Sequence, residues 1–348
     1  MDLIDVHAHV VPKYFPANPS PASNARWPCM CSATGSGALH GNHEETQTTV
    51  DIAGKPFRSI DHRSWDAARR IDDMDRNGIT MQALSPMPEL LSYWFTPQDG
   101  LAMARWMNGW IADMVSTAPA RFCGLGIVPM QEPTLAAQEL SRLKADGFSG
   151  VEIGSNINTV VLGDRRFDEF WAEAERLDLA VFVHALHPIG ADRLQQDFPD
   201  LVPFAAFPLD TALSAVSLIR AGVPLRFPRL RLGFSHGGGA IVPLVHRLGQ
   251  GWNITNGFNG ALPEAPVTYA RRLFYDSLVY ERDYLRHLLC EFAPGQVFGG
   301  TDYPYAIMET DLRSFVDGGA LAALDANARA SLRHGAARRF LGLQPAAN

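Results

Sequence analysis

Eight short apolar runs rich in β-branched residues recur along the 348-residue chain, and segments of helical character separate them. Each run ends in polar or glycine-rich residues, as is typical where a buried strand ends. Buried strands that alternate with helices form a parallel sheet covered on both faces, and eight such units close a (β/α)8 barrel. The sequence thus predicts a distorted (β/α)8 TIM barrel, with a doubly wound open sheet as the alternative. The runs are residues 3–10, 79–87, 122–130, 148–156, 179–187, 229–237, 273–280 and 295–304.

The segment SWDAARRIDDMDRNG has the pattern of an amphipathic helix. Trp65, Ala68, Ile71 and Met74 fall near helical spacing, and Gly78 follows as a natural stop. We expect comparable helices between the other strands.

About fifty residues rich in Pro, Ser, Gly and Asn separate the first predicted strand from this helix. Connections of that length are uncommon in compact domains unless they are functional or disordered. Within them, TTVDIAGKPFRSID predicts a hairpin with its turn near residues 53–55. We therefore expect a single domain over residues 1–348, with an ordered insertion, about residues 11–62, over the barrel mouth.

Charge and composition exclude several classes of partner. A net charge of −7 and a pI near 5.9 argue against nucleic-acid binding, which needs a basic surface. Hydrophobic residues make up 47% of the chain, as in ordinary globular proteins, and we expect neither a signal peptide nor a run of the roughly 18 apolar residues that span a membrane. Four unevenly placed cysteines favour reduced thiols and a cytoplasmic protein.

The stretch DVHAHV places His7 and His9 one residue apart at the end of the first predicted strand. Alternate side chains of a strand point to the same side, so both imidazoles can reach one point in the barrel mouth. This spacing suits two ligands of one metal ion. Two buried histidines bonded to the backbone have the same spacing, so the motif alone does not decide.

Three other strand ends carry residues of similar chemistry. His184 lies in VFVHALHP, His236 in FSHGGG and Asp302 in GGTDYP. Catalytic groups of barrels gather at these ends, and a buried carboxylate is costly unless it is paired or bound to metal. The sequence therefore predicts a site for one divalent cation, with zinc the first choice and manganese, iron or cobalt as alternatives.

Five candidate groups exceed the number that a catalytic zinc usually binds, so we expect one of them to move protons. We assign this role to His236. The glycines at 237–239 let the backbone approach a ligand closely, and an imidazole pKa of about 6.5 suits a general base. The alternative is a histidine that caps the following helix.

Six stretches that span most of the chain carry the pattern of a known family. They are DVHAHVVPKYFP, GKPFRSIDHRSWDAARRIDDMDRNGI, GVEIGSN, VFVHALHP, GFSHGGGAIVPLVHRLGQGW and VFGGTDYPY. Together they resemble the metal-dependent amidohydrolase superfamily, in the branch typified by 2-amino-3-carboxymuconate-6-semialdehyde decarboxylase. The resemblance implies that His7, His9, His184 and Asp302 bind the metal and that His236 is the catalytic base.

The same resemblance implies a role for two arginines. Arg58 and Arg247 are similar to family residues that hold substrate carboxylates, the second from a neighbouring subunit, which implies a homodimer. A guanidinium can fork onto a carboxylate, although either residue could instead be a solvated surface charge. After His184 the chain departs from the family with ALHP, and His187 could be a substrate contact, a proton carrier or a bystander.

The resemblance implies non-oxidative C–C cleavage in aromatic-compound catabolism, with no organic cofactor. The metal would polarise a substrate oxygen or activate water, and His236 would move a proton to the carbon that loses CO2. The expected substrate is an unsaturated or aromatic carboxylic acid similar to 2-amino-3-carboxymuconate semialdehyde. One alternative is a hydrolase or hydratase that uses the same ligands, and another is a metal-binding scaffold without catalysis.

Four further residues suggest a zinc knuckle in the insertion. Cys29, Cys31, His40 and His43 are close in sequence, but C-x-C is tighter than the usual spacing of a structural site. We expect loop residues here instead.

Three acidic positions on the predicted strands have open roles. Glu152 in GVEIG could bridge two metals, although we favour a single ion. Asp5 and Asp276 could orient a histidine N–H or make ordinary strand-end hydrogen bonds.

Overall fold

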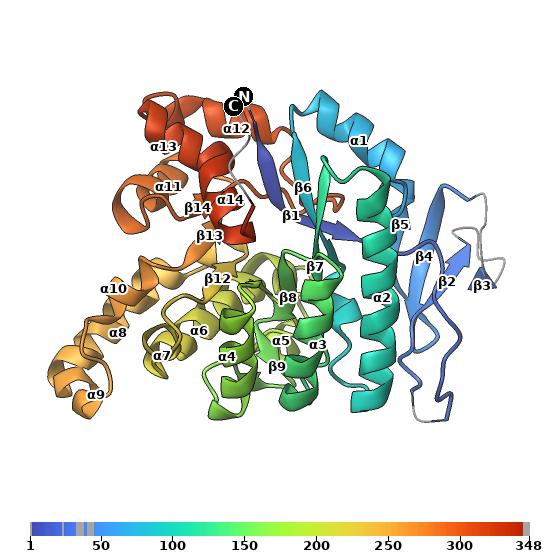
Figure 1. Cartoon of the computed structure of the whole chain (residues 1–348), viewed down its shortest axis with the longest axis horizontal. Helices are drawn as coiled ribbons and strands as arrows, with labels where there is room; N and C mark the ends of the chain where they lie inside the picture. Colours follow the sequence, from blue (N-terminus) through green and yellow to red (C-terminus); the bar gives the residue numbers. More distant parts are fainter. Residues whose placement is uncertain (1, 23, 33–37, 40–44, 344–348) are drawn as a thin grey trace.

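Eight parallel strands form the centre of the computed structural model, which describes residues 2–22, 24–32, 38–39 and 45–343 (Figure 1). They neighbour one another in chain order, and bridges from Asp5 to Gly299 and from Ala8 to Tyr303 join the first strand to the last segment. The barrel prediction is confirmed, and the open-sheet alternative is wrong. The strands are β1 Ile4–Val10, β6 Met81–Pro86, β7 Phe122–Gly126, β8 Gly150–Gly154, β11 Ala180–His184, β12 Arg231–Phe234, β13 Phe274–Asp276 and β14 Val297–Phe298.

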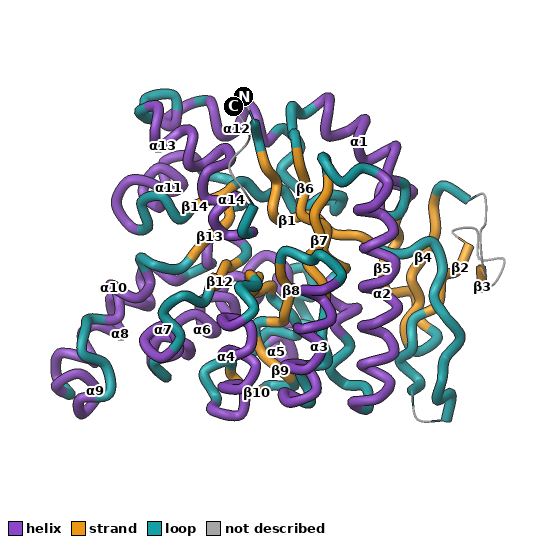
Figure 2. The backbone as a smooth tube through the Cα atoms, in the orientation of Figure 1, coloured by secondary structure: helices purple, strands orange, loops and turns teal. Residues whose placement is uncertain are grey.

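Helices surround these strands, as the purple tubes around the orange strands show in Figure 2. A two-stranded ribbon of β9 (Asn156–Ile157) and β10 (Val160–Val161) follows β8. The helices are α1 Ala67–Arg76, α2 Pro97–Thr117, α3 Pro133–Ala145, α4 Asp168–Arg176, α5 Ala191–Leu194, α6 Phe207–Arg220, α7 Val223–Arg226, α8 Ile241–Ile254, α9 Asn256–Gly260, α10 Pro266–Ala270, α11 Arg282–His287, α12 Leu312–Asp317, α13 Ala326–Ala330 and α14 Ala336–Leu341.

Helix α1 ends as its sequence predicts, but it begins at Ala67, so Trp65 lies in the turn before it. The Asp66 carboxylate accepts the amide of Ala68 at 2.9 Å and caps the first turn, and Gly78, with φ of 65°, follows the end. Arg70 of this helix is fully buried and donates to the carbonyl of His9 at 2.7 Å. The helix therefore holds the end of β1, where two of the predicted ligands lie.

Aromatic rings fill the interior of the barrel. Phe182 and Phe298 on the strands pack against Phe340 of α14, with ring centroids 5.0 to 6.4 Å apart. The ring of His7 lies against Phe182, with 5.3 Å between centroids. This apolar layer closes one side of the interior and leaves polar side chains beyond it at the C-terminal strand ends.

Strand β1 contains an irregularity that matters for the site. Its pairing with β6 shifts register between Asp5 and Ala8. Such a bulge changes the phase of side-chain alternation by one residue. Val6 packs in the interior cluster, and His7 lies against the same cluster although it is the next residue.

The long connection after β1 forms a separate antiparallel sheet. Its strand order is β3-β2-β4-β5, from β2 Cys29–Ser32, β3 Ala38–Leu39, β4 Gln47–Ile52 and β5 Lys55–Asp61. The turn between the last two strands consists of Ala53 and Gly54, whose φ angles of 56° and 69° suit a two-residue hairpin. The predicted hairpin is confirmed, and Figure 1 shows this sheet beside α2.

The expectation that Cys29 and Cys31 are loop residues is wrong, because both lie on β2. This strand pairs with β4 over four residues, and Met30 between the cysteines is 1% exposed. An alternating run of only four residues is too short to separate strand from loop by pattern. His40 and His43 lie outside the described residues.

The expectation of no membrane-length apolar run is also wrong. Val202–Arg220 is long and apolar enough to cross a membrane by length and composition alone, with a mean hydropathy of 1.6. It includes α6, which packs against α8 in the outer layer and carries a buried Asp210. Some of its apolar surface is exposed, including Phe204 and Leu209.

Candidate metal centre

Four of the predicted ligands meet at the C-terminal end of the barrel. His7 Nε2 lies 3.1 Å from His9 Nε2, and Asp302 Oδ1 lies 3.1 Å from His9 Nε2 and 3.5 Å from His7 Nε2. With His184 included, one potential ligand atom of each residue lies within 4.8 Å of the others. All four residues are buried, and they come from β1, β11 and the segment after β14.

Each imidazole of this group is held through its Nδ1 atom. The pairs are His7 with the Asp276 carboxylate at 2.7 Å, His9 with the Pro86 carbonyl at 2.9 Å and His184 with the Ala185 carbonyl at 2.8 Å. Because these partners are acceptors, Nδ1 donates in each case, and Nε2 keeps its lone pair whenever the ring is neutral. A histidine ligand needs this arrangement to bind a metal ion through Nε2.

Two of the ligand atoms have no hydrogen-bond partner within the described residues. They are His184 Nε2 and Asp302 Oδ1, and both are buried. A buried polar atom without a partner costs free energy unless a cation or water satisfies it. Three imidazole nitrogens and one carboxylate oxygen form a ligand set that suits a divalent transition metal, so the residues present fit such an ion.

The charges of the group shift its proton affinities. Burial disfavours an imidazolium, but the hydrogen bond to Asp276 and the charge of Asp302 raise the pKa of His7 to about 9. Burial opposes ionisation of Asp302, but the contact with His9 and the positive charge of His7 lower its pKa to about 2. Burial beside the other imidazoles holds the pKa of His184 well below its ordinary value. Without a cation, His7 is therefore an imidazolium at neutral pH, with protons on both ring nitrogens.

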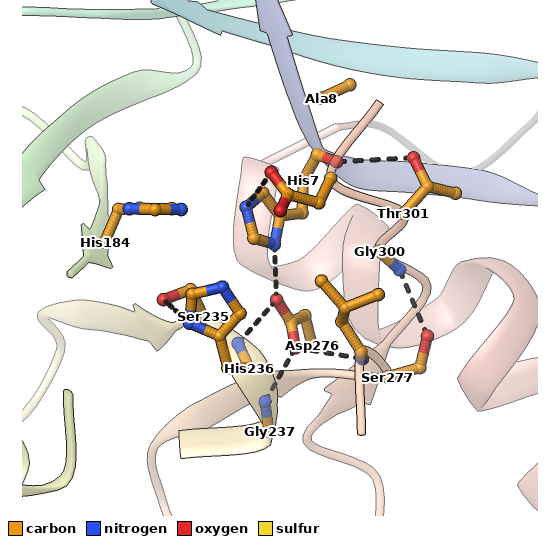
Figure 3. Close-up of polar contacts among 12 residues, drawn as sticks. His7, Ala8, His184, Ser235, His236, Gly237, Asp276, Ser277, Gly300 and Thr301 are labelled. Carbon is orange, nitrogen blue, oxygen red and sulfur yellow. Dashed lines mark hydrogen bonds and ion pairs between the residues drawn. The ribbon is translucent and has the colours of Figure 1, made fainter. Parts of the chain in front are cut away.

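Asp276 connects the metal ligands to the predicted base (Figure 3). Its Oδ2 accepts the backbone amide of His236 at 2.9 Å in addition to His7 Nδ1, and its Oδ1 accepts the amide of Gly237 at 2.7 Å. The ring centroid of His236 lies 5.1 Å from that of His184 and 5.4 Å from that of His7. One carboxylate thus positions a metal ligand and a neighbouring imidazole together.

His236 lies outside the four-ligand group and lines the cavity above it. Its Nδ1 is 3.1 Å from the hydroxyl of Ser235. Burial and the nearby charge of His7 lower the pKa of His236 to about 4, so its ring is neutral at neutral pH. A neutral imidazole on a cavity wall can accept a proton from a bound molecule.

A cavity of about 1840 Å³ opens above these residues, with His236 and Asp302 in its lining. The insertion contributes Arg58 to the same lining. The guanidinium of Arg58 lies 4.3 Å from the ring centroid of Tyr305, and this ring stacks on His9 with 5.2 Å between centroids. The Tyr305 ring therefore lies between the positive charge of Arg58 and the predicted ligand His9.

His187 lines another part of the cavity wall and belongs to a group of four side chains. Its Nε2 lies 2.9 Å from one oxygen of Glu89, whose other oxygen accepts from Arg26 at 2.8 Å. The Trp94 ring stacks on His187 with 4.9 Å between centroids, and Arg26 lies 4.1 Å from the same indole. The His187 side chain is 47% exposed, so a ligand in the cavity can reach it.

The remaining predicted residues are not members of the four-ligand group. Arg247 is exposed on α8 and does not line the cavity. Glu152 is buried with its Oε2 3.8 Å from His9 Nδ1, which is the nitrogen that faces away from the ligand cluster. Asp5 accepts the hydroxyl of Thr301 at 2.6 Å and makes a strand-end contact. Of the two aspartates considered, Asp276 therefore contacts an imidazole.

Tyr305, Glu89 and Trp94 were not identified from the sequence. Tyr305 follows Asp302 by three residues in DYPY, so its position after a predicted ligand was a usable signal. Glu89 and Trp94 lie in the loop after β6, and no pattern in the sequence relates them to His187.

The chain is similar to known proteins of one family over most of its length. A family model described as Amidohydrolase matches residues 4–343. The 2-amino-3-carboxymuconate-6-semialdehyde decarboxylase of Dictyostelium discoideum is 34% identical over 347 residues, which cover 98% of this chain and 92% of that protein. The gamma-resorcylate decarboxylase of Rhodococcus jostii is 29% identical over 259 residues, which cover 68% and 76%.

Solved structures share the fold. The 5-carboxyvanillate decarboxylase from Sphingomonas paucimobilis aligns with a TM-score of 0.75 at 24% identity and covers 99% of this chain and 100% of that one. A dihydroxybenzoic acid decarboxylase from Polaromonas sp. JS666, with bound manganese and the inhibitor 2-nitroresorcinol, has a TM-score of 0.73 at 21% identity and covers 99% and 98%.

Proposed function

The chain belongs to the amidohydrolase family, in its decarboxylase branch, and we propose that it is a metal-dependent, non-oxidative carboxy-lyase of aromatic-compound catabolism. The proposed substrate is an unsaturated or aromatic carboxylic acid similar to 2-amino-3-carboxymuconate semialdehyde. The observation that carries this proposal is the convergence of three imidazole nitrogens and one carboxylate oxygen beside a neutral histidine in a cavity. No organic cofactor is part of it.

His7, His9, His184 and Asp302 would hold one divalent cation, with zinc the first choice and manganese, iron or cobalt as alternatives. When bound, such an ion supplies Lewis-acid polarisation of a substrate oxygen or a more acidic water.

His236 moves the proton in this scheme. Its neutral ring accepts a proton from a substrate hydroxyl or a water and returns it to the carbon that bears the carboxylate. The C–C bond to the carboxylate breaks with its electron pair left on that carbon, a C–H bond forms there, and CO2 leaves. The φ of 55° at His236 and the contact with Asp276 keep the ring on the cavity wall.

Arg58 and His187, which both line the cavity, would bind the substrate. The guanidinium of Arg58 can donate two parallel hydrogen bonds to a carboxylate, and its stack on Tyr305 limits its motion. His187, held by Glu89, can contact a polar group farther from the reacting carbon.

A homodimer in which Arg247 enters the neighbouring cavity completes the proposal. The cavity of about 1840 Å³ exceeds the ~300–1,000 Å³ of most ligand pockets, which leaves room for a partner's side chain. Ile189 and Phe204 line the cavity and are 66% and 59% exposed, as suits a surface that a second subunit covers. The proposed unit is a single-domain cytoplasmic protein with its insertion, about residues 11–62, over the mouth.

An assay of CO2 release tests the proposal. A panel of unsaturated and aromatic carboxylic acids is incubated with metal-loaded protein, with chelated protein, and with chelated protein to which zinc or manganese is returned. We expect one acid or more to lose CO2, loss of activity on chelation, and recovery when metal is restored.

Product analysis separates this function from its alternatives. A product that has gained water while keeping its carboxylate identifies a hydratase or hydrolase with the same ligands. Metal-loaded protein that leaves every acid and amide of the panel unchanged identifies a metal-binding scaffold.

A further inference from the structure

Two thiols and a carboxylate lie together on the insertion sheet, apart from the barrel ligands. Cys29 and Cys31 alternate on β2 and so share one face, and their sulfur atoms are 3.6 Å apart. Asp51 on β4 is the direct cross-strand neighbour of Cys29. One potential ligand atom of each of the three residues lies within 4.8 Å of the others.

The separation of the sulfurs fits two ligands of one ion. A tetrahedral cation with metal–sulfur bonds of about 2.3 Å places two thiolates ~3.8 Å apart, close to the 3.6 Å between these atoms. The antiparallel pairing of β2 with β4 sets Asp51 beside this pair, where its carboxylate supplies a third, anionic ligand. All three residues are half-buried, so solvent can supply a fourth ligand.

A disulfide fits the same residues less well. Residues two apart on an extended strand have Cα atoms ~6.6 to 6.8 Å apart, at the upper limit of ~6.8 Å for disulfides. An S–S bond of about 2.05 Å would also require the two sulfurs to approach by ~1.5 Å while the backbone of β2 stays hydrogen-bonded in the sheet. The pairing with β4 on one side and β3 on the other opposes that movement.

We propose that Cys29, Cys31 and Asp51 form a second metal site, which takes a thiophilic divalent cation such as zinc or cadmium and stabilises the insertion sheet. The ion would connect β2 to β4 at one end of the hairpin that carries Arg58. The pairing of β4 with β5 changes register between Val50, opposite Arg58, and Asp51, opposite Pro56. The site therefore lies next to the bulge that sets where Arg58 enters the cavity.

Cadmium is the probe that distinguishes this site from the barrel, because the barrel ligands contain no sulfur. Protein whose barrel is loaded with manganese is titrated with Cd²⁺, and thiolate-to-cadmium charge-transfer absorbance is recorded. We expect saturation at one equivalent per chain. The variants Cys29→Ser and Cys31→Ser each lose most of the signal, and Asp51→Asn binds at least tenfold more weakly.

Cys290→Ser is the matched control, since Cys290 is exposed and outside the cluster, and it keeps the full signal. Zinc content by mass spectrometry gives the independent readout: two ions per wild-type chain and one in the Cys29→Ser/Cys31→Ser double variant. A charge-transfer signal that survives both single variants, or equal zinc content in wild type and double variant, overturns the proposal. Either result leaves the decarboxylase proposal untouched, because that function depends on the barrel ligands.

Discussion

Asp276 Oδ2 lies 2.7 Å from His7 Nδ1 and 2.9 Å from the backbone amide of His236, so one oxygen contacts both a metal ligand and the proposed base. A carboxylate in this position fixes the tautomer of His7 and the location of the turn that carries His236. The amide of Gly237 occupies the other oxygen at 2.7 Å.

Asp276→Asn tests this arrangement. We expect metal affinity in the barrel to fall by about 10- to 100-fold, because the amide removes the negative charge that supports His7 and brings N–H groups toward backbone donors. Competition with a chelator of known affinity measures the loss. Asp283→Asn, an exposed aspartate on α11, should leave affinity unchanged. Equal affinity in Asp276→Asn and wild type would show that the contact does not support the site.

Metal binding should depend on pH through His7. In the metal-free protein its pKa is raised to about 9, so a proton must leave before the metal binds at neutral pH. The apparent association constant should rise about tenfold per pH unit between about pH 6 and 8, and level off near pH 9. Calorimetry in buffers of different ionisation enthalpy counts the protons released, and about one per ion is expected. No release at pH 7 contradicts the assignment.

His236→Asn should separate chemistry from metal binding. Asparagine tolerates the positive φ of this position better than alanine, so the turn is preserved. We expect kcat to fall by about 10²- to 10⁴-fold with metal content unchanged, because only proton transfer is removed. Metal analysis of the same sample is the control. A variant that keeps wild-type kcat excludes His236 as the base.

Arg58→Lys keeps the charge but removes the planar fork and its stack on Tyr305. We expect kcat/KM to fall by about 10- to 100-fold, mainly through KM, since hydrogen bonds to a carboxylate are weakened. Steady-state kinetics with the best acid of the panel measures the effect. Arg165→Lys, on an arginine that is 72% exposed, is the matched control. A change confined to kcat would place Arg58 in the chemical step instead.

Subunit mixing tests whether Arg247 acts in a neighbouring cavity. Arg247→Ala and His236→Asn are each expected to be inactive alone. In a random mixture half of the dimers are hybrids, and each hybrid has one intact site, so about a quarter of wild-type activity should return. Activity that stays at the level of the separate variants contradicts the exchange.

The barrel and its metal ligands could be predicted because both depend on short patterns. The spacing and order of the apolar runs predict eight strands. Parallel strands in a barrel bring their C-terminal ends together regardless of the lengths of the loops. His7, His9, His184 and Asp302 all occupy such ends, so their convergence follows from topology alone.

Contacts that depend on register between distant segments could not be predicted. Whether Asp5 or Asp276 would face an imidazole depends on where β13 lies relative to β1, and His7 and Asp276 are 269 positions apart in the sequence. The pairing of Cys29 with Asp51 requires the register of β2 on β4, across residues with no strong strand pattern. Trp94 and Glu89 reach His187 through a loop whose path is set by packing.

The bridges that join β1 to the segment after β14 have a consequence for how the protein is made. His7 and His9 are synthesised before Asp302, whose amide donates to the carbonyl of His7 at 2.8 Å. A nascent chain cannot assemble the full ligand set until β1 has paired with the segment after β14. Binding of the ion by all four ligands in the barrel therefore follows closure of the strand ring.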